Sequence, residues 1–293
     1  MSTADAAQNK VARNKKVRSP LVQRFLEQRL ALFAAGFILF LVAVSALAPW
    51  LAPYDPYKQD LMRILESPSG AHWLGTDELG RDQFSRFLYA GRTTLLASAE
   101  AVAVCLLLGL PFGLLAGYLG GIVDTVLSRL TDALMSAPAL ILAVAVVAVL
   151  GPGLTNAMLA IGVVSSPSLF RIVRGATISV RSETYIEACR AIGCTPGRIM
   201  RKHVLLNIIP PVAVQVALLL GVAMLAEASL SFLGLGVRPP MPSWGSMLRT
   251  AFDNIYAAKH LVYAPGIAIG LAVLAFSTVG DGLREVLSAG RRS

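Results

Sequence analysis

The chain has 293 residues, of which 55% are hydrophobic and only 15% are charged. Because about 25% of the residues of an average soluble domain are charged, this composition excludes a disordered chain, a collagen-like chain and a small disulfide scaffold, and it indicates an integral membrane protein. The net charge of +9 comes from 26 Lys and Arg against 17 Asp and Glu. In a membrane protein, the side of the membrane on which such charges lie matters more than their sum.

Long segments without Asp, Glu, Lys or Arg predict the membrane spans. A helix that crosses a hydrocarbon core of about 30 Å needs roughly 20 apolar residues. The long third segment contains Gly151-Pro152-Gly153, which predicts a turn between two helices, and the fifth continues past Glu227. We therefore expect an all-α, polytopic membrane protein with six transmembrane helices. The charge-free segments are residues 30–54, 101–123, 133–170, 203–226 and 260–280.

The basic residues indicate how the spans are oriented. Lys and Arg gather in the N-terminal tail, after the fourth span and at the C-terminus. With six spans these segments share one side, which the positive-inside rule makes cytoplasmic, and we expect membrane lipid and not nucleic acid around the chain. We predict a cytoplasmic basic tail (1–29), a first transmembrane helix (30–54) and an extracytoplasmic loop (55–94). A core with five further transmembrane helices follows (95–288) and contains a cytoplasmic loop (174–203). A cytoplasmic C-terminal tail (289–293) ends the chain.

Motifs for catalysis, nucleotide binding and metal binding are absent from the sequence. It has no G-x-x-x-x-G-K-[ST] phosphate loop, no H-E-x-x-H zinc motif and no G-x-S-x-G nucleophile elbow. Cys189 and Cys194 have no second pair of ligands, so we expect them and Cys105 to be structural thiols. We predict no catalytic residue, no metal and no cofactor in this chain. A transporter or channel is favoured over an enzyme, with its energy supplied by another chain or by an ion gradient.

The outer loop contains a cluster of turn-forming and charged residues. Gly suits tight turns, and an Asp side chain accepts a hydrogen bond from the backbone two residues on, so an Asx-type turn that starts a short helix accounts for the cluster. The alternative is contact with a substrate-delivering protein or with the entrance of a pore. The residues concerned are Gly75, Thr76, Asp77, Gly80, Arg81 and Asp82.

Four glycines recur at every fourth position of the second span. A helix face with this spacing is smooth, so another helix can approach it closely. We predict helix packing along this face, and Pro111 permits a local kink. The glycines are Gly109, Gly113, Gly117 and Gly121.

The loop between spans four and five predicts a short helix with defined ends. Thr184 and Glu187 have the spacing of a capping box, and Gly193 suits the left-handed residue that follows a helix. Thr195-Pro196 predicts the start of a second helix. The first helix either lies on the lipid surface or docks a cytoplasmic partner. The residues expected to share its apolar face are Tyr185, Ala188, Cys189 and Ile192.

Glu227 is an isolated carboxylate within the fifth span. A carboxylate inside a membrane is costly and usually faces a cavity or a partner group. Two interpretations remain open: a structural hydrogen bond near the outer end of the helix, or a pore-lining or gating group. Ser229 and Ser231 could bond to Glu227 or line the same path.

The short predicted helix resembles an element of a known family. Glu187-Ala188-Cys189, followed after three residues by Gly193, is similar to the EAA loop of ABC-importer permeases, with Cys189 in place of the second Ala and Leu206 in place of a family Pro. The resemblance implies a coupling helix that sits in a cleft of an ATP-binding subunit. The residues of this ATPase-coupling loop are Tyr185, Glu187, Ala188, Cys189, Arg190 and Gly193.

Two further segments are similar to dipeptide and oligopeptide permeases. His72-Trp-Leu-Gly-Thr-Asp-Glu-Leu-Gly-Arg-Asp82 resembles the stretch before their second span, and Ser231-Phe-Leu-Gly-Leu-Gly-Val-Arg-Pro-Pro240 resembles the loop after their fifth. Both are similar to the second of two different permease subunits, and the resemblance covers roughly residues 20–290. Nickel and glutathione importers share much of the pattern, so it defines the subunit type better than the cargo.

The resemblance implies a type I ABC importer permease fold in a bacterial cytoplasmic (inner) membrane, with both termini in the cytoplasm. It also implies a heterodimer with a second homologous permease subunit, two ATP-binding subunits that hold ATP and Mg, and an extracytoplasmic substrate-binding protein. The expected cargo is a dipeptide or oligopeptide, and the alternative is nickel or glutathione. A gradient-driven secondary transporter is less favoured, since it should show inverted repeats and ion-coordinating broken helices.

Overall fold

The computed structural model describes residues 28–289, which are almost entirely helical. The predicted basic tail 1–29, apart from its last two residues, and the tail 289–293, apart from its first, lie outside the described residues. The elements are α3 (Arg29–Ala46), α4 (Ala48–Leu51), α5 (Gln83–Leu119), α6 (Gly121–Met135), α7 (Ala139–Leu150), α8 (Leu154–Arg181), α9 (Thr184–Ala191), α10 (Pro196–Ile199), the π-helix η2 (Met200–Val204), α11 (Leu205–Phe232), α12 (Trp244–Asp253), the 3-10 helix η3 (Lys259–Val262) and α13 (Tyr263–Ala289).

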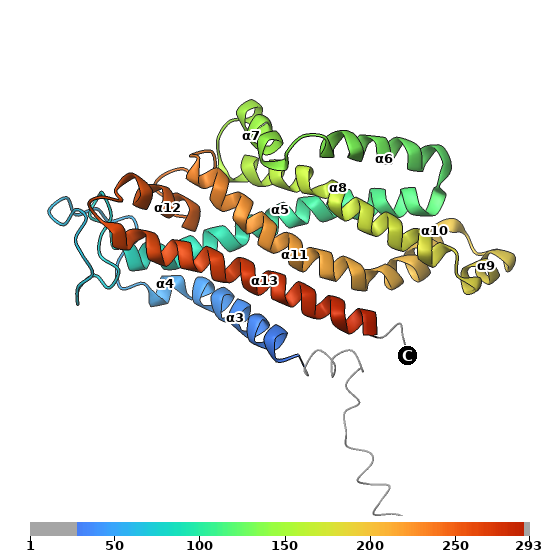
Figure 1. Cartoon of the computed structure of the whole chain (residues 1–293), viewed down its shortest axis with the longest axis horizontal. Helices are drawn as coiled ribbons and strands as arrows, with labels where there is room; N and C mark the ends of the chain where they lie inside the picture. The colour runs from blue at the N-terminus through green and yellow to red at the C-terminus, as the bar shows by residue number, and fades with distance from the viewer. Residues whose placement is uncertain (1–27, 290–293) are drawn as a thin grey trace, which may run out of the picture.

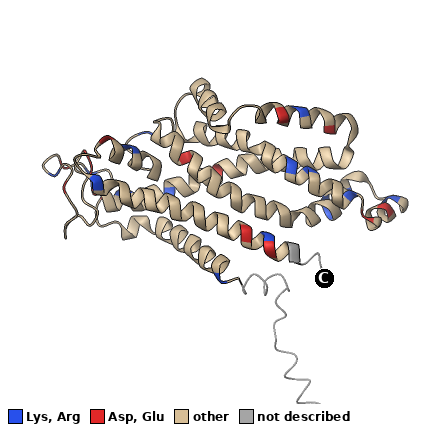
Figure 2. Cartoon of the chain, in the orientation of Figure 1, with Lys and Arg blue, Asp and Glu red and all other residues tan. Residues whose placement is uncertain are grey.

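The helices form an elongated bundle (Figure 1). α3 lies along α13 on one long side, and α6 and α7 lie beside α8 on the opposite side. The loop between α4 and α5 lies with α12 at one end of the bundle, whereas α9 and α10 lie at the other end. Figure 2 shows charged residues near both ends and on α6 and the adjoining part of α8, while α3 is uncharged beyond Arg29.

Five helical segments are long and apolar enough to cross a membrane, and a bent pair of helices can provide a sixth span. The bent pair is α6 and α7, which meet at 90°. The predicted break at Gly151-Pro152-Gly153 is confirmed, because α7 ends at Leu150 and α8 begins at Leu154. The five segments are Arg29–Ala46, Gln83–Leu119, Leu154–Arg181, Pro196–Phe232 and Lys259–Leu287.

The predicted turn at Gly151-Pro152-Gly153 implies one helix of about 18 residues over residues 133–150, but this run is divided between two helices. α6 ends at Met135, and α7 begins at Ala139 after Pro138. Proline has no N–H to donate and disfavours a helical conformation in the preceding residue, so the apolar run bends here. α7 has 12 residues, which is about 18 Å of helix and too short to cross the hydrocarbon core alone.

The predicted first transmembrane helix, residues 30–54, consists of two helices. α3 ends at Ala46, and α4 begins at Ala48 with Pro49 in its first turn. Because Pro49 cannot donate a backbone hydrogen bond, the hydrogen-bond ladder of α3 is interrupted at Leu47.

Two other helices extend into segments that were expected to be loops. α5 begins at Gln83, inside the predicted outer loop 55–94, and α8 runs to Arg181, inside the predicted loop 174–203. The absence of charge marks the part of a helix that suits the hydrocarbon core, whereas the helix continues as long as its backbone hydrogen bonds are made. The sequence therefore locates these spans better than it locates the helix ends.

The close packing of α5 on α8 confirms the prediction made for the first three glycines of the stripe. A Cβ atom at each of them would lie under 3.0 Å from a side-chain carbon of α8, which is too close for any carbon contact. Gly121 takes no part, because it follows the end of α5 and nothing lies within 4 Å of its Cβ position. The glycines and the α8 residues that face them are Gly109 with Leu169, Gly113 with Val173, and Gly117 with Thr177.

Replacing Gly113 by Ala should destabilise the bundle. The new Cβ would lie 2.8 Å from Cβ of Val173, and such overpacking typically costs about 1–3 kcal/mol. We expect a lower melting temperature for the purified protein in detergent. The matched control is Gly36→Ala on α3, whose Cβ would meet nothing within 4 Å and which should not be destabilised, since Ala favours helices over Gly. Equal melting temperatures for the two variants would contradict the packing role of the stripe.

Candidate functional site: a short exposed helix and a charged outer loop

α9 is the short helix predicted between spans four and five, and it ends as expected. Gly193 has φ of +82°, its N–H donates to the carbonyl of Arg190 at 3.0 Å, and the N–H of Cys194 donates to the carbonyl of Cys189 at 3.0 Å. This is the Schellman arrangement, in which a left-handed residue allows the last helical carbonyls to be satisfied. Because nothing lies within 4 Å of the Cβ position of Gly193, the backbone conformation and not crowding requires glycine here.

The predicted capping box at the start of α9 is wrong. Glu183 is the N-cap residue, and neither its side chain nor that of Thr184 makes a capping hydrogen bond. The carbonyl of Glu183 accepts from the N–H of Ile186 at 2.9 Å and from that of Glu187 at 3.4 Å. The helix thus begins one residue earlier than the capping box requires. Thr195-Pro196 does start α10 as predicted, although the Thr195 side chain makes no capping hydrogen bond.

The inward face of α9 also differs from the predicted face. Ile186 is fully buried, and Cys189 packs half-buried against the same hydrophobic core, whereas Ile192 is 80% exposed. Since only two residues join α8 to α9, this short connection fixes the rotation of the helix. The exposed residues of α9 are Thr184, Tyr185, Glu187, Ala188, Arg190 and Ala191.

Side-chain contacts attach α9 to two membrane spans. Nδ2 of Asn207, on α11, donates to the hydroxyl of Tyr185 at 3.1 Å. The guanidinium of Arg190 lies over the ring of Tyr118, near the end of α5, at 5.6 Å from its centroid, as in a cation–π contact. Partial burial, followed by the nearby Glu183, raises the pKa of Tyr185 above its ordinary value. No spacing in the sequence links Tyr118 or Asn207 to this helix.

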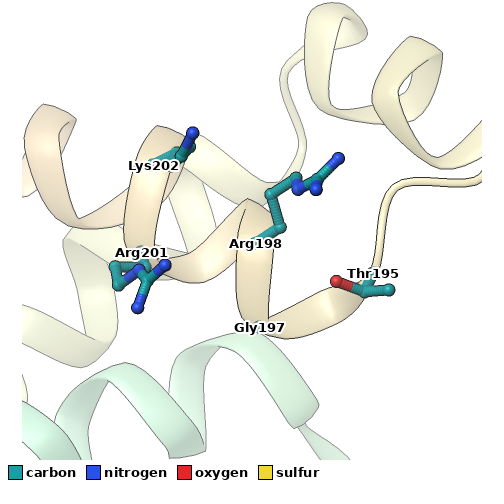
Figure 3. Close-up of a pocket in the computed structure, with 5 residues that line it drawn as sticks. All are labelled: Thr195, Gly197, Arg198, Arg201 and Lys202. Atoms are coloured by element: carbon teal, nitrogen blue, oxygen red, sulfur yellow. The ribbon is translucent and has the colours of Figure 1, made fainter.

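A basic pocket follows α9, where the chain turns towards α11 (Figure 3). Arg198 and Lys202 point to one side of the helix and Arg201 points to the other. The π-helical turn η2 then leads into α11, which contains Pro210 and Pro211. The pocket is lined by Thr195, Gly197, Arg198, Arg201 and Lys202.

Asp77 is the centre of the outer loop at the other end of the bundle. Its carboxylate accepts from the backbone N–H of Leu79 at 2.9 Å and pairs with Nε of Arg81 at 2.7 Å and with Nε of Arg86 at 3.2 Å. The bond to Leu79, two residues on, is the predicted Asx-type turn. All three charged side chains are at most 8% exposed, so this carboxylate neutralises buried guanidinium groups.

The two loop glycines are required by both conformation and space. Gly75 and Gly80 have φ of +77° and +68°. A Cβ at Gly75 would lie 2.3 Å from the carbonyl oxygen of Glu66, and one at Gly80 would lie 1.8 Å from that of Asp60. Between them, the hydroxyl of Thr76 accepts from the N–H of Glu66 at 2.9 Å. These contacts fold the loop back on itself.

Asp82 connects the outer loop to α5. Its carboxylate accepts from the N–H of Ser85 at 2.8 Å as the N-cap of α5, and it lies 2.8 Å from Nδ1 of His72. The helix that follows the turn is therefore a long span and not a separate short helix. All six residues of the predicted outer-loop cluster are buried, which favours the structural interpretation over contact with a substrate-delivering protein or with the entrance of a pore.

Glu227 lies inside the subunit and is 0% exposed. Its Oε1 accepts from the hydroxyl of Ser231 at 2.7 Å. Ser229 is half-buried and donates instead to the carbonyl of Leu225 at 2.8 Å. Ser231, and not Ser229, is therefore the partner of Glu227, and this geometry favours the structural hydrogen bond over the pore-lining group.

The described part of the chain holds no grouping suited to metal chemistry. Among residues 28–289, no three His, Cys, Asp or Glu side chains come together as a potential metal site. Cys105, Cys189 and Cys194 are free thiols. One end of the bundle carries an exposed helix with a defined C-terminus, and the other carries a loop that is held by buried charges.

Family models match most of the chain. Residues 109–293 match the binding-protein-dependent transport system inner membrane component, and residues 20–68 match the N-terminal TM domain of oligopeptide transport permease C. The glutathione transport system permease protein GsiD of Pectobacterium atrosepticum is 43% identical over 281 residues, covering 94% of this chain and 93% of that protein. GsiD of Escherichia coli O6:K15:H31 is 41% identical over 276 residues, covering 93% and 91%.

Solved structures share the fold. A chain from inward-facing conformations of the MetNI methionine ABC transporter superposes with a TM-score of 0.57 at 21% identity, covering 69% of this chain and 97% of that one. A second crystal form gives 0.54 at 23% identity, covering 66% and 93%. The helical order and the family matches agree with the resemblance drawn from the motifs. The chain belongs to the inner-membrane components of binding-protein-dependent transport systems, and it is a permease subunit of an ABC importer and not an enzyme.

Proposed function

We propose that this chain is the second permease subunit of an importer of dipeptides or oligopeptides, and that α9 is its ATPase-coupling helix. The observation that carries the proposal is the construction of α9. Ile186, with the half-buried Cys189 beside it, anchors the helix in the core, while Glu187, Ala188 and Arg190 are exposed at the end of the bundle. Such a helix can be held firmly by the permease and still present a surface to another subunit.

The proposed complex contains a different, homologous permease subunit as the heterodimer partner. Two ATP-binding subunits would bind ATP and Mg, and one of them would hold α9 in a cleft. An extracytoplasmic binding protein would deliver the cargo. The end of the bundle that carries α9 would then be cytoplasmic, together with both termini, as the excess of Lys and Arg in these segments supports. Closure of the ATPase pair would move α9 and, through its contacts to α5 and α11, alternate the access of the path.

The cargo proposal rests on similarity to peptide permeases. The oligopeptide permease model matches residues 20–68. The curated relatives at 41–43% identity are named for glutathione, which is itself a tripeptide. Of the two alternative cargoes, glutathione is therefore better supported than nickel.

The cognate binding protein provides the direct test of cargo. We expect mass spectrometry of the purified binding protein to detect short peptides, and titration calorimetry to show that they bind tightly. Tight binding of glutathione alone would favour the alternative, and tight binding of nickel would overturn the peptide proposal. Uptake into proteoliposomes should require ATP and the ATP-binding subunits; transport on a proton gradient without them would overturn the importer mechanism.

Replacing Glu227 by Gln should leave both uptake and stability close to those of the unchanged protein. Gln keeps an oxygen that can accept from Ser231, which Oε1 now does at 2.7 Å, and it has nearly the same volume. Glu227→Ala removes the acceptor, and the unpaired hydroxyl should cost about 1–3 kcal/mol, measured as a lower melting temperature. If the Gln variant folds normally but loses uptake, the pore-lining interpretation is favoured instead.

A further inference from the structure

We propose that Cys189 and Cys194 form a reversible dithiol–disulfide pair across the end of α9, which a low-molecular-weight disulfide oxidises and a low-molecular-weight thiol reduces. Oxidation ties α9 to the fifth span and slows uptake. The effect on uptake rests on the proposed coupling role of α9, whereas the formation of the disulfide does not. The inference is carried by the places of the two cysteines in the turn that ends α9.

The turn that ends α9 brings the two cysteines together. In a Schellman turn, the third-last helical residue and the second residue beyond the helix share a main-chain hydrogen bond, and their side chains frequently contact each other. Cys189 and Cys194 occupy these positions: the N–H of Cys194 donates to the carbonyl of Cys189 at 3.0 Å, and Gly193 between them has φ of +82°. With standard bond lengths, this hydrogen bond holds the two Cα atoms at most about 7 Å apart. The Cα atoms of disulfide-bonded residues usually lie about 4.4–6.8 Å apart, so little movement of the backbone is needed.

The two thiols are accessible, unlike the third cysteine of the chain. Cys189 and Cys194 are free and half-buried, and both pack against the same hydrophobic core. Cys105 is 1% exposed within α5, where a reagent in water does not reach it. Because Cys189 lies on the side of α9 that faces the permease, a subunit that docks on the exposed Glu187 and Arg190 need not cover the pair.

Neither cysteine is needed to build the turn. A Schellman turn requires a left-handed residue, here Gly193, and no thiol. Cys189 also stands where the EAA loop that this segment resembles has Ala, so docking does not require it either. In reducing compartments such as the cytoplasm, disulfides are rare and are usually transient, with catalytic or redox-sensing roles. Two thiols that face each other at the end of α9 in a chain without catalytic motifs therefore point to a redox response.

The chemistry is thiol–disulfide exchange in two steps. The thiolate of one cysteine attacks a sulfur of the reagent disulfide, which forms a mixed disulfide, breaks the reagent S–S bond and releases one reagent thiolate. The thiolate of the other cysteine then attacks the protein sulfur of the mixed disulfide and releases the second reagent thiolate. Cys189 and Cys194 lose two electrons and two protons, and the reagent takes them up and becomes two thiols. An added thiol such as dithiothreitol reverses both steps.

A bond between the two sulfurs restrains the joint between α9 and the fifth span. α9 ends at Ala191, and the continuous apolar helical segment Pro196–Phe232 follows. Thr195, the residue after Cys194, is the N-cap of this segment. Cys194 therefore moves with the fifth span, whereas Cys189 moves with α9. The disulfide limits the rotation of α9 relative to that span, so less of the movement of an ATPase pair reaches the membrane helices.

Tryptic peptides test the disulfide directly. Trypsin cuts the chain between the two cysteines, after Arg190, so they fall in separate peptides, residues 182–190 and 191–198. The purified complete transporter is treated with bis(2-hydroxyethyl) disulfide, which is not a peptide and does not compete as cargo, and the remaining thiols are blocked before digestion. We expect mass spectrometry to find the two peptides joined, and to find them separate after dithiothreitol. A reagent adduct on Cys189 or Cys194 without joined peptides, or no reaction at either, would overturn the pair.

Uptake by the oxidised complex tests the consequence. After the reagent is removed, ATP-driven uptake into proteoliposomes should be several-fold slower than before treatment and should recover with dithiothreitol. Cys194→Ser and Cys189→Ala should be insensitive to the reagent although their partner subunits are unchanged, and Cys105→Ser should stay as sensitive as the unaltered chain. Unchanged uptake by a complex whose peptides are joined would overturn the effect on uptake, and so would an equal loss in Cys194→Ser. If the untreated complex shows no ATP-driven uptake, the proposed function fails, and the joined peptides alone decide the pair.

Discussion

A transporter complex that carries Gly193→Val should hydrolyse ATP but import little cargo. Gly193 has φ of +82°, and an L-residue in the left-handed region costs about 1–2 kcal/mol, with β-branched residues disfavoured most. The chain would relieve this strain by giving up the two hydrogen bonds that end α9, which shifts the helix relative to the following span. We expect uptake into proteoliposomes to fall about tenfold, while ATP hydrolysis by the complex and the amount of permease in the membrane persist.

Two variants separate backbone strain from other effects of the change. Gly193→Asn should retain most uptake, since Asn tolerates the left-handed region. Gly197→Val places the same side chain nearby, where a Cβ also meets nothing within 4 Å but φ is not positive, so it should be close to neutral. Full uptake by Gly193→Val would count against a coupling role for the end of α9.

The features that could be predicted from sequence depend on residues that are close together along the chain. Charge-free runs locate the membrane spans because the hydrocarbon core excludes charge over a fixed length. The end of α9 was predictable because a left-handed residue after a helix is almost always glycine or asparagine. The contact of Gly113 with Val173 follows the same logic, since four-residue spacing defines a helix face whatever packs on it.

The features that the sequence did not predict depend on how elements are joined in space. Counting apolar residues predicted one helix over residues 133–150, but the chain bends near Pro138 and the run is divided between α6 and α7. The apolar face of α9 could not be assigned because the two-residue connection to α8 sets its rotation and buries Ile186. The contacts of Tyr118 and Asn207 with α9 join distant segments, and no periodicity in a single sequence reports them.

The outer-loop residues show a different limit of the same reasoning. Their types predicted tight turns, and the turns are present, but residue types alone left open whether Asp77 serves the loop or a partner. Burial decides between the two, since Asp77 is 2% exposed and contacts Arg81 and Arg86 within the same loop and helix start. The charge of Asp77 therefore stabilises the fold, and its removal should destabilise the protein.

Replacing Asp77 by Asn should destabilise the protein by about 3–5 kcal/mol, because it leaves the Arg81 and Arg86 guanidinium groups buried without a counter-charge. We expect a markedly lower melting temperature in detergent and faster proteolysis of the outer loop. The control is Asp60→Asn in the same loop: its pair with Arg63 is about half exposed, at 48% and 49%, and should cost less than about 1 kcal/mol. Equal melting temperatures for these two variants would show that the loop is held by its backbone turns and not by its buried charges. A large difference would mean that the carboxylate of Asp77 sets the shape of this end of the permease.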